Sequence, residues 1–118
     1  MKVRAISLLV IALLTVCRAD ESIVEYAGVQ KANSLSGVIT DQAGAPIPQV
    51  TVQEMSDDWT TVFQTTATDV NGRWVFPEER GKKVHQIRFK KYAFHELRFR
   101  VKLTHKKAKP LDFEMPVA

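Results

Sequence analysis

The sequence predicts an all-β protein, a β-sandwich of seven antiparallel strands preceded by a signal-peptide helix. Short runs of β-branched and aromatic residues recur from residue 35 to the C-terminus, and clusters of Gly, Pro, Asn and Asp separate them. Apolar and polar side chains alternate within these runs, whereas no run after residue 19 has the apolar spacing of a helix. At 118 residues the chain is long enough for one small domain.

The N-terminus has the three-part layout of a secretory signal peptide. Lys2 and Arg4 form a basic start, residues 5–16 form an apolar run, and Cys17 and Ala19 place small residues at positions −3 and −1 of a cleavage site. The apolar run is about a dozen residues long, well short of the roughly 20 that a membrane-spanning helix needs. We therefore predict that residues 1–19 are removed, that the mature chain has no membrane span, and that it is secreted or periplasmic.

Cys17 is the single cysteine, so cleavage after Ala19 leaves a mature chain without disulfides or thiolate chemistry. An alternative is that Cys17 carries a lipid anchor. Val16 departs from the small residue that precedes the cysteine in a bacterial lipobox. The sequence leaves cleavage and anchoring open.

The charge of the mature chain argues against a nucleic-acid partner. Loss of three cations with the signal peptide, Lys2, Arg4 and Arg18, lowers the formal net charge from +4 to +1. Acidic residues dominate from residue 20 to 79, and basic residues dominate from Arg80 onward. Such asymmetry either guides an anionic partner or reflects acidic and basic strands that lie side by side and neutralise one another.

Residues 20–34 are polar and rich in small side chains, which predicts a flexible leader arm that can include a short strand around Ile23 to Tyr26. The predicted domain occupies residues 35–118. Its first strand carries Leu35 and Ile39 on one face, and a turn rich in glycine and proline follows, because proline cannot donate to a central strand ladder.

The remaining strands follow from the same alternation. A second strand begins at Val50, and the threonine-rich run 61–68 suits a half-exposed third strand. A break in the period between Tyr92 and Leu97 predicts a turn or bulge. The inward residues of the last four strands are Trp74 and Phe76; Ile87 and Phe89; Leu97, Phe99, Val101 and Leu103; and Leu111, Phe113, Met115 and Val117.

Two segments carry a recognisable pattern. Residues 37–47 read GVITDQAGAPI, and residues 66–76 read TATDVNGRWVF. Their order and spacing resemble the two signature blocks of the carboxypeptidase regulatory-like domain family. The resemblance covers residues 35–118 and implies an Ig-like or transthyretin-like sandwich of seven strands. Two departures are Gln49-Val50, where the family usually has Gly-Ala, and Lys91-Tyr92, where it has a Gly-Tyr step.

The motif residues have structural roles that need no ligand. Glycine permits backbone angles that a Cβ disfavours, aspartate accepts hydrogen bonds from turn amides, and proline fixes φ. We expect Asn71-Gly72 to take positive φ in a tight turn. The predicted structural turn residues are Gly37, Asp41, Gly44, Pro46, Asp69, Asn71 and Gly72.

The sequence predicts no catalytic residue, cofactor or metal site. In the family that it resembles, the regulatory-like domain is an appendage of the enzymes. A zinc carboxypeptidase needs His-x-x-Glu plus a further histidine, and none of His85, His95 and His105 has a glutamate three residues later. We expect these histidines to face solvent. No nucleophile elbow, phosphate-binding glycine loop or complete calcium loop occurs in the sequence.

Five residues are candidates for a binding surface: Trp59, Lys91, Tyr92, Phe94 and Arg98. Exposed aromatic rings stack on sugars or anchor a protein partner, but they also cap the open ends of sandwiches. Basic residues on a sheet face also discourage edge pairing. By analogy with the family, we expect a non-catalytic accessory module for protein contact or spacing at a cell envelope. The alternative is a carbohydrate-binding module, so the unknown partner is a protein or a glycan.

Overall fold

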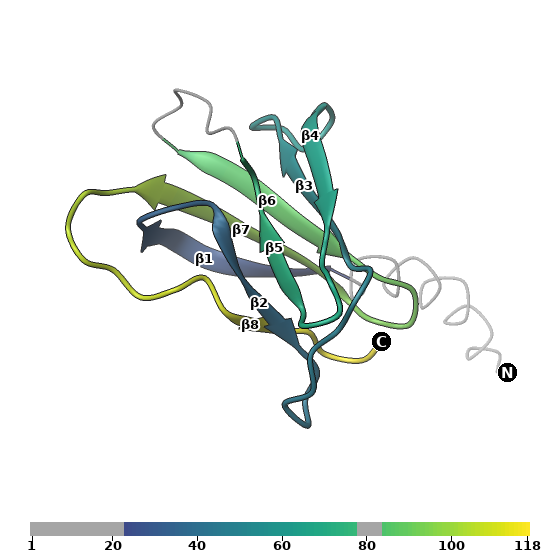
Figure 1. Ribbon diagram of the computed structural model, residues 1–118. Helices are drawn as coiled ribbons and strands as arrows, with labels where there is room; N and C mark the ends of the chain where they lie inside the picture. The colour runs from purple at the N-terminus through teal and green to yellow at the C-terminus, as the bar shows by residue number, and fades with distance from the viewer. Residues whose placement is uncertain (1–22, 78–83) are drawn as a thin grey trace, which may run out of the picture.

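The computed structural model describes residues 23–77 and 84–118, which form eight strands in two sheets (Figure 1). The strands are β1 (Ile23–Ala32), β2 (Ser36–Thr40), β3 (Thr51–Met55), β4 (Val62–Ala67), β5 (Arg73–Val75), β6 (His85–Lys90), β7 (Glu96–Leu103) and β8 (Phe113–Glu114). One sheet has the order β1-β7-β6-β3-β4, and the other has the order β5-β2-β8. The prediction of an all-β sandwich is confirmed, and the predicted signal-peptide helix lies outside the described residues.

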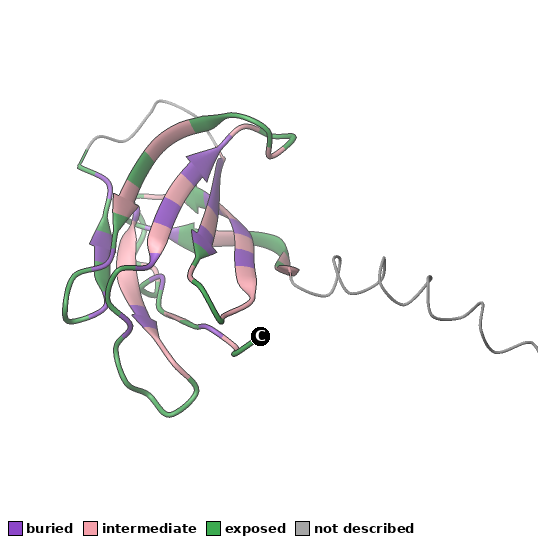
Figure 2. Cartoon of the chain, turned by 90° about the vertical axis from the view of Figure 1, so that its right-hand side faces the viewer, coloured by how far each residue is buried: buried purple, intermediate pink, exposed green. Residues whose placement is uncertain are grey.

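Alternation along the strands turns one face of each sheet toward the shared interior. Leu97, Phe99 and Val101 of β7 are buried, whereas Arg98 and Arg100 between them are only partly covered. Figure 2 shows the same banding, with buried segments separated by more exposed ones along the strands. Burying a large apolar side chain stabilises the fold by about 1.5–3 kcal/mol, so this pattern fixes which face of the strand turns inward.

Aromatic rings join the two sheets at the centre of the core. The ring of Phe89 in β6 has centroid distances of 5.5 Å to Trp74 in β5, 5.1 Å to Phe99 in β7 and 5.7 Å to Phe113 in β8. All three contacts are edge-to-face, an arrangement that aromatic quadrupoles favour. Because β5 and β8 belong to one sheet and β6 and β7 to the other, these rings hold the layers together.

Two features of the topology differ from the prediction. The sheets are mixed rather than wholly antiparallel, because β1 pairs in parallel with β7 and β2 pairs in parallel with β8. There are eight strands rather than seven, because residues 23–32 of the predicted arm form the edge strand β1. Gly28, with φ +77°, accompanies a register shift between Glu25 and Val29. This irregularity interrupts the alternation by which strands are found in a sequence.

Two Asp-x-x-Gly turns repeat one hydrogen-bond pattern. The Oδ1 atom of Asp41 accepts hydrogen bonds from the amides of Ala43 and Ala45, both at 2.9 Å, and Gly44 follows at φ +88°. In the second turn Asp69 and Gly72 take the equivalent places. The two aspartates therefore have a structural role, because their carboxylates accept hydrogen bonds from backbone amides of their own turns.

The second turn packs against β2. Asp69 Oδ1 accepts hydrogen bonds from the amides of Asn71 at 2.8 Å and Arg73 at 3.0 Å. The φ angle is positive at Gly72 (72°) but not at Asn71, so the expectation for Asn71 is wrong. The Gly72 carbonyl accepts a hydrogen bond of 2.8 Å from the Ile39 amide, which ties this turn to the first motif segment.

Asp69 makes the stability of the protein depend on pH. The hydrogen bond from the Arg73 amide is the main cause that lowers the pKa of this carboxyl group in the folded state. The ionised group therefore stabilises the fold above its unfolded pKa, and this stabilisation is lost as the pH falls through the lower, folded pKa. We expect Asp69→Asn, which keeps an acceptor oxygen but cannot ionise, to lose less stability than the wild type below about pH 4. Urea unfolding across that pH range measures this difference, and parallel pH profiles for the two proteins would contradict it.

Candidate functional site

The outward face of the five-stranded sheet carries two of the predicted binding residues in direct contact. The Arg98 guanidinium carbon lies 4.8 Å from the centre of the Trp59 ring, within the range of a cation–π interaction. Arg98 Nε also donates a hydrogen bond of 2.7 Å to Glu96 Oε2. Trp59 is thus half-buried against the sheet, and a planar cation covers one side of its ring.

A groove of about 550 Å³ continues from Glu96 toward the turn between β6 and β7. Tyr92 stands on this turn and is 95% exposed, the highest exposure among the large apolar side chains that the structure describes. Phe94, also in the groove wall, is half-buried and packs against the core. The lining residues, which we call the Tyr92 groove, are Gln49, Thr51, Lys90, Lys91, Tyr92, Phe94 and Glu96.

The structure therefore places the five predicted binding residues on one connected surface. We define the Tyr92 face as the Tyr92 groove together with Trp59 and Arg98, because the Arg98–Glu96 hydrogen bond joins the two parts. From the sequence, the three aromatic residues either cap the core or are exposed, and the structure gives a different result for each of them. Phe94 covers the core, Trp59 packs on the outer sheet face, and Tyr92 is free of the core.

The backbone of this surface is strained. Among the described residues, three that are not glycine have positive φ: Gln49 at 61°, Trp59 at 62° and Ala93 at 75°. This conformation costs about 1–2 kcal/mol for a residue with a Cβ. Gln49 lines the groove, Trp59 lies on the same face and Ala93 follows Tyr92. Local strain that the rest of a fold must support is frequently found at binding sites.

The C-terminal segment braces the turn that presents Tyr92. The Ala118 amide donates to the Ala93 carbonyl at 2.9 Å, and the His95 amide donates to the Pro116 carbonyl at 2.9 Å. Within the turn, the Phe94 amide donates to the Lys91 carbonyl at 3.1 Å. The base of the turn is therefore fixed by the C-terminal segment and by a hydrogen bond within the turn, while the Tyr92 ring remains in solvent.

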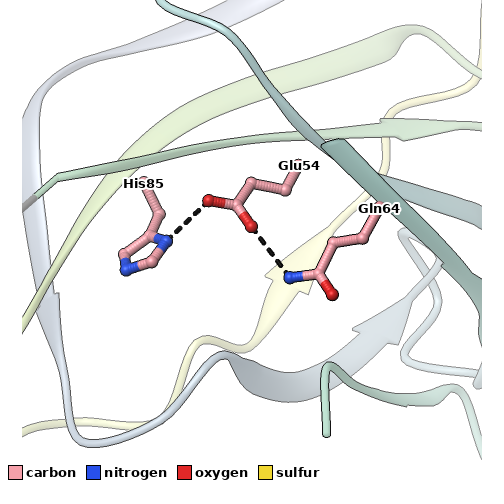
Figure 3. A network of polar contacts seen from close by, with 3 residues as sticks. All are labelled: Glu54, Gln64 and His85. Carbon is pink, nitrogen blue, oxygen red and sulfur yellow. Dashed lines mark hydrogen bonds and ion pairs between the residues drawn. The ribbon is translucent and has the colours of Figure 1, made fainter. Parts of the chain in front are cut away.

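A buried polar network lies on the opposite, inner face of the same sheet (Figure 3). Glu54 and His85 are both fully buried, with 2.7 Å between Glu54 Oε2 and His85 Nδ1. Gln64 donates a second hydrogen bond of 2.8 Å to Glu54 Oε1. The expectation that His85 faces solvent is wrong. His85 lies two residues before Ile87, in phase with the inward side chains, so the strand alternation itself contained the signal for its burial.

This network does not resemble a metal centre. Within residues 23–77 and 84–118, no group of three or more His, Cys, Asp or Glu side chains is arranged to hold a metal ion. His85 Nε2 is buried without a partner among the described residues, and neither groove includes it. Over the same residues, no helix is long and apolar enough to cross a membrane.

A second groove, of about 690 Å³, lies along β2, β5 and the segment that leads into β8. Sequence analysis did not predict it, and none of the five candidate binding residues lines it. Its charged side chains balance: Arg73 and Lys109 oppose Asp69 and Asp112. Asp112 is already engaged, since its Oδ1 accepts a hydrogen bond of 3.0 Å from the Val38 amide. The Tyr92 groove therefore remains the stronger candidate for binding.

Comparison with known families identifies the domain. The profile of the carboxypeptidase regulatory-like domain matches residues 34–116, which is more than half of the chain. The chain belongs to the carboxypeptidase regulatory-like domain family. This match confirms the resemblance of the two motif segments. No curated protein matches the sequence.

Carboxypeptidase regulatory-like domains are in general non-catalytic β-sandwich modules, and the architecture of this domain agrees with that description. Its two motif segments supply the paired Asp-x-x-Gly turns between β2 and β3 and between β4 and β5. These turns lie away from the Tyr92 groove, whose lining includes neither aspartate nor either turn glycine. In this regulatory-like domain the family signature thus builds the sandwich, and the candidate binding surface comes from other residues.

Proposed function

We propose that this regulatory-like domain is an exported, non-catalytic accessory module that contacts a protein partner at the cell envelope through the Tyr92 face. The observation that carries the proposal is the 95% exposure of the Tyr92 side chain on a braced turn. Tyrosine is enriched among the residues that dominate binding energy at protein interfaces. Lys90 and Lys91 line the same groove as the Tyr92 ring and supply polar groups beside it, as at the rim of an interface.

Two further observations support the proposal. The N-terminal sequence has the layout of a secretory signal peptide, which accounts for export. Membership of a generally non-catalytic family accounts for the accessory role. Function by fold analogy alone is a weak argument, so the proposal depends on the surface of this particular chain.

Site-specific cross-linking in cells that produce the chain tests the proposal. A photoreactive phenylalanine analogue is placed at Tyr92 or, as a matched control, at Val70, which is 78% exposed on the turn between β4 and β5. We expect a discrete protein adduct from position 92 in the envelope fraction and none from position 70. Equal adducts from both positions, or retention of the chain in the cytoplasm, would count against the proposal.

Carbohydrate binding is the second candidate function, because an exposed tyrosine ring also stacks on sugars. Trp59 suits this role less well, since Arg98 covers one side of its ring. A glycan array probed with the wild type and with Tyr92→Ala separates the candidates. Binding that Tyr92→Ala abolishes supports the glycan candidate, and an array without any wild-type signal removes it.

A further inference from the structure

We infer that the Tyr92 groove takes an extended, acidic segment of a protein partner, an inference that rests on the proposed function. The charge of the groove is the first reason. Its one carboxylate, on Glu96, already accepts a hydrogen bond from Arg98 at 2.7 Å. Among the described residues, neither Lys90 nor Lys91 has a carboxylate within ion-pair distance. Within residues 23–77 and 84–118, the groove therefore presents two cations without a carboxylate partner, which attract and orient an anionic partner.

The arrangement of the lining favours an extended segment. Gln49 lies in the turn before β3, and Thr51 begins that strand. Lys90 ends β6, Glu96 begins β7, and the connection between these two strands supplies Lys91, Tyr92 and Phe94. The Gln49 amide and Thr51 hydroxyl provide both donors and acceptors for a peptide backbone. Successive side chains of an extended peptide point in opposite directions, so an acidic residue at every second position would face the lysines. The Tyr92 ring, 95% exposed, is accessible to apolar side chains of the same peptide.

The strained backbone supports the use of this groove. Gln49 keeps its side chain in the groove lining despite φ 61°, where glycine would carry no strain. Ala93, at φ 75°, fixes the direction of the chain after Tyr92. Such positions persist only when the surroundings impose them. The Ala118 amide holds Ala93 through its carbonyl, and the Gln49 amide is held by the Thr68 carbonyl at 3.0 Å. The groove is thus organised before a partner arrives, which lowers the entropic cost of binding.

Fluorescence anisotropy with the full chain tests the inference. The probe is a short fluorescein-labelled peptide in which Glu alternates with Leu, and matched peptides carry Gln or Lys in place of Glu. We expect the Glu peptide to bind, the other two to bind at least about tenfold more weakly, and affinity to fall with rising salt. Lys90→Glu/Lys91→Glu and Tyr92→Ala are each expected to weaken binding about tenfold, whereas Tyr92→Phe keeps most of it.

A charge-matched variant controls for non-specific attraction. Lys106→Glu/Lys107→Glu changes two adjacent exposed lysines in the loop after β7, away from the Tyr92 groove, and should leave peptide affinity unchanged. Thermal unfolding confirms that each variant is folded. Equal weakening by both lysine pairs would overturn the inference, as would failure of the wild type to bind the Glu peptide.

An anionic sugar is the competing ligand, and oligogalacturonate serves as its probe. Oligogalacturonate binding that requires Tyr92, with no binding of the Glu peptide, would also overturn the inference and favour the glycan candidate. A protein adduct from position 92 without Glu-peptide binding would leave the proposed function standing and remove only the acidic segment. If the adduct from position 92, binding of the Glu peptide and binding of oligogalacturonate are all absent, both the proposed function and the acidic-segment inference are removed.

Discussion

Glu54→Leu is expected to lower the free energy of unfolding by about 3 kcal/mol, the upper end of the usual cost of leaving a buried hydrogen-bonding group without its partner. The Glu54 carboxylate is fully buried and accepts hydrogen bonds from both His85 at 2.7 Å and Gln64 at 2.8 Å. Its removal takes away the hydrogen-bond partner of His85 Nδ1, and Nε2 already has no partner among the described residues. Urea unfolding monitored by Trp fluorescence measures the loss.

The double variant Glu54→Leu/His85→Leu decides whether this cost comes from the orphaned partner. Replacing both partners of a buried hydrogen bond by apolar groups of similar shape can be nearly neutral, so the double variant should recover much of the stability. Gln53→Leu is the matched control, since Gln53 is the preceding residue of β3 and points outward to Arg88. A double variant no more stable than Glu54→Leu would show that the buried pair itself stabilises the fold.

Gly37→Ala is expected to lower the free energy of unfolding by about 3 kcal/mol or more, at or above the usual range for overpacking. A Cβ at position 37 would overlap the Leu111 carbonyl oxygen and lie 2.6 Å from the carbonyl carbon. Both atoms are backbone, so no side-chain rotation can make room. Relief requires β2 and the segment before β8 to separate, which also pulls Asp112 from the Val38 amide. Chemical denaturation of the variant measures the effect.

Gly44→Ala provides the comparison for Gly37→Ala. A Cβ at Gly44 has no heavy atom within 4 Å, but the residue has φ +88°. Its substitution should therefore cost only the backbone strain, about 1–2 kcal/mol. A ranking in which Gly44→Ala is the more destabilising variant would mean that β2 and the Leu111 segment can move apart at little cost.

The strands that bury one face, such as β3 and β7, follow from the alternation of apolar and polar residues in the sequence. Leu97, Phe99 and Val101 alternate with basic residues, and such a strand can lie in the sheet in only one orientation. β1 lacks this regularity: its register shifts near Gly28, and several of its side chains are exposed. β1 pairs in parallel with β7, and β2 pairs in parallel with β8. These pairings depend on which distant segments meet, and alternation within one strand carries no such information.

The sequence predicted the residues of the candidate site, but it did not predict that they share one surface. Tyr92 and Phe94 stand where the strand period breaks, and this break predicts a turn. The neighbouring Trp59 comes from a different turn, and its contact with Arg98 depends on the pairing of β3, β6 and β7. Glutamate side chains are generally exposed, so the burial of Glu54 was not predicted from the sequence. The buried Glu54 carboxylate is hydrogen-bonded to His85, which lies beside it in the structure.

The pairing of Ile23 with Glu96 places the start of β1 beside the start of β7. Glu96 lines the Tyr92 groove, so the first residue of β1 lies at the same end of the sheet as that groove. Should Cys17 carry a lipid, the intervening residues can extend at most about 20 Å, at 3.3–3.6 Å per residue. Such a tether would hold the groove close to the bilayer, within reach of short membrane-proximal segments of neighbouring proteins. A chain cleaved after Ala19 would be free of this restriction and could meet its partner in any orientation.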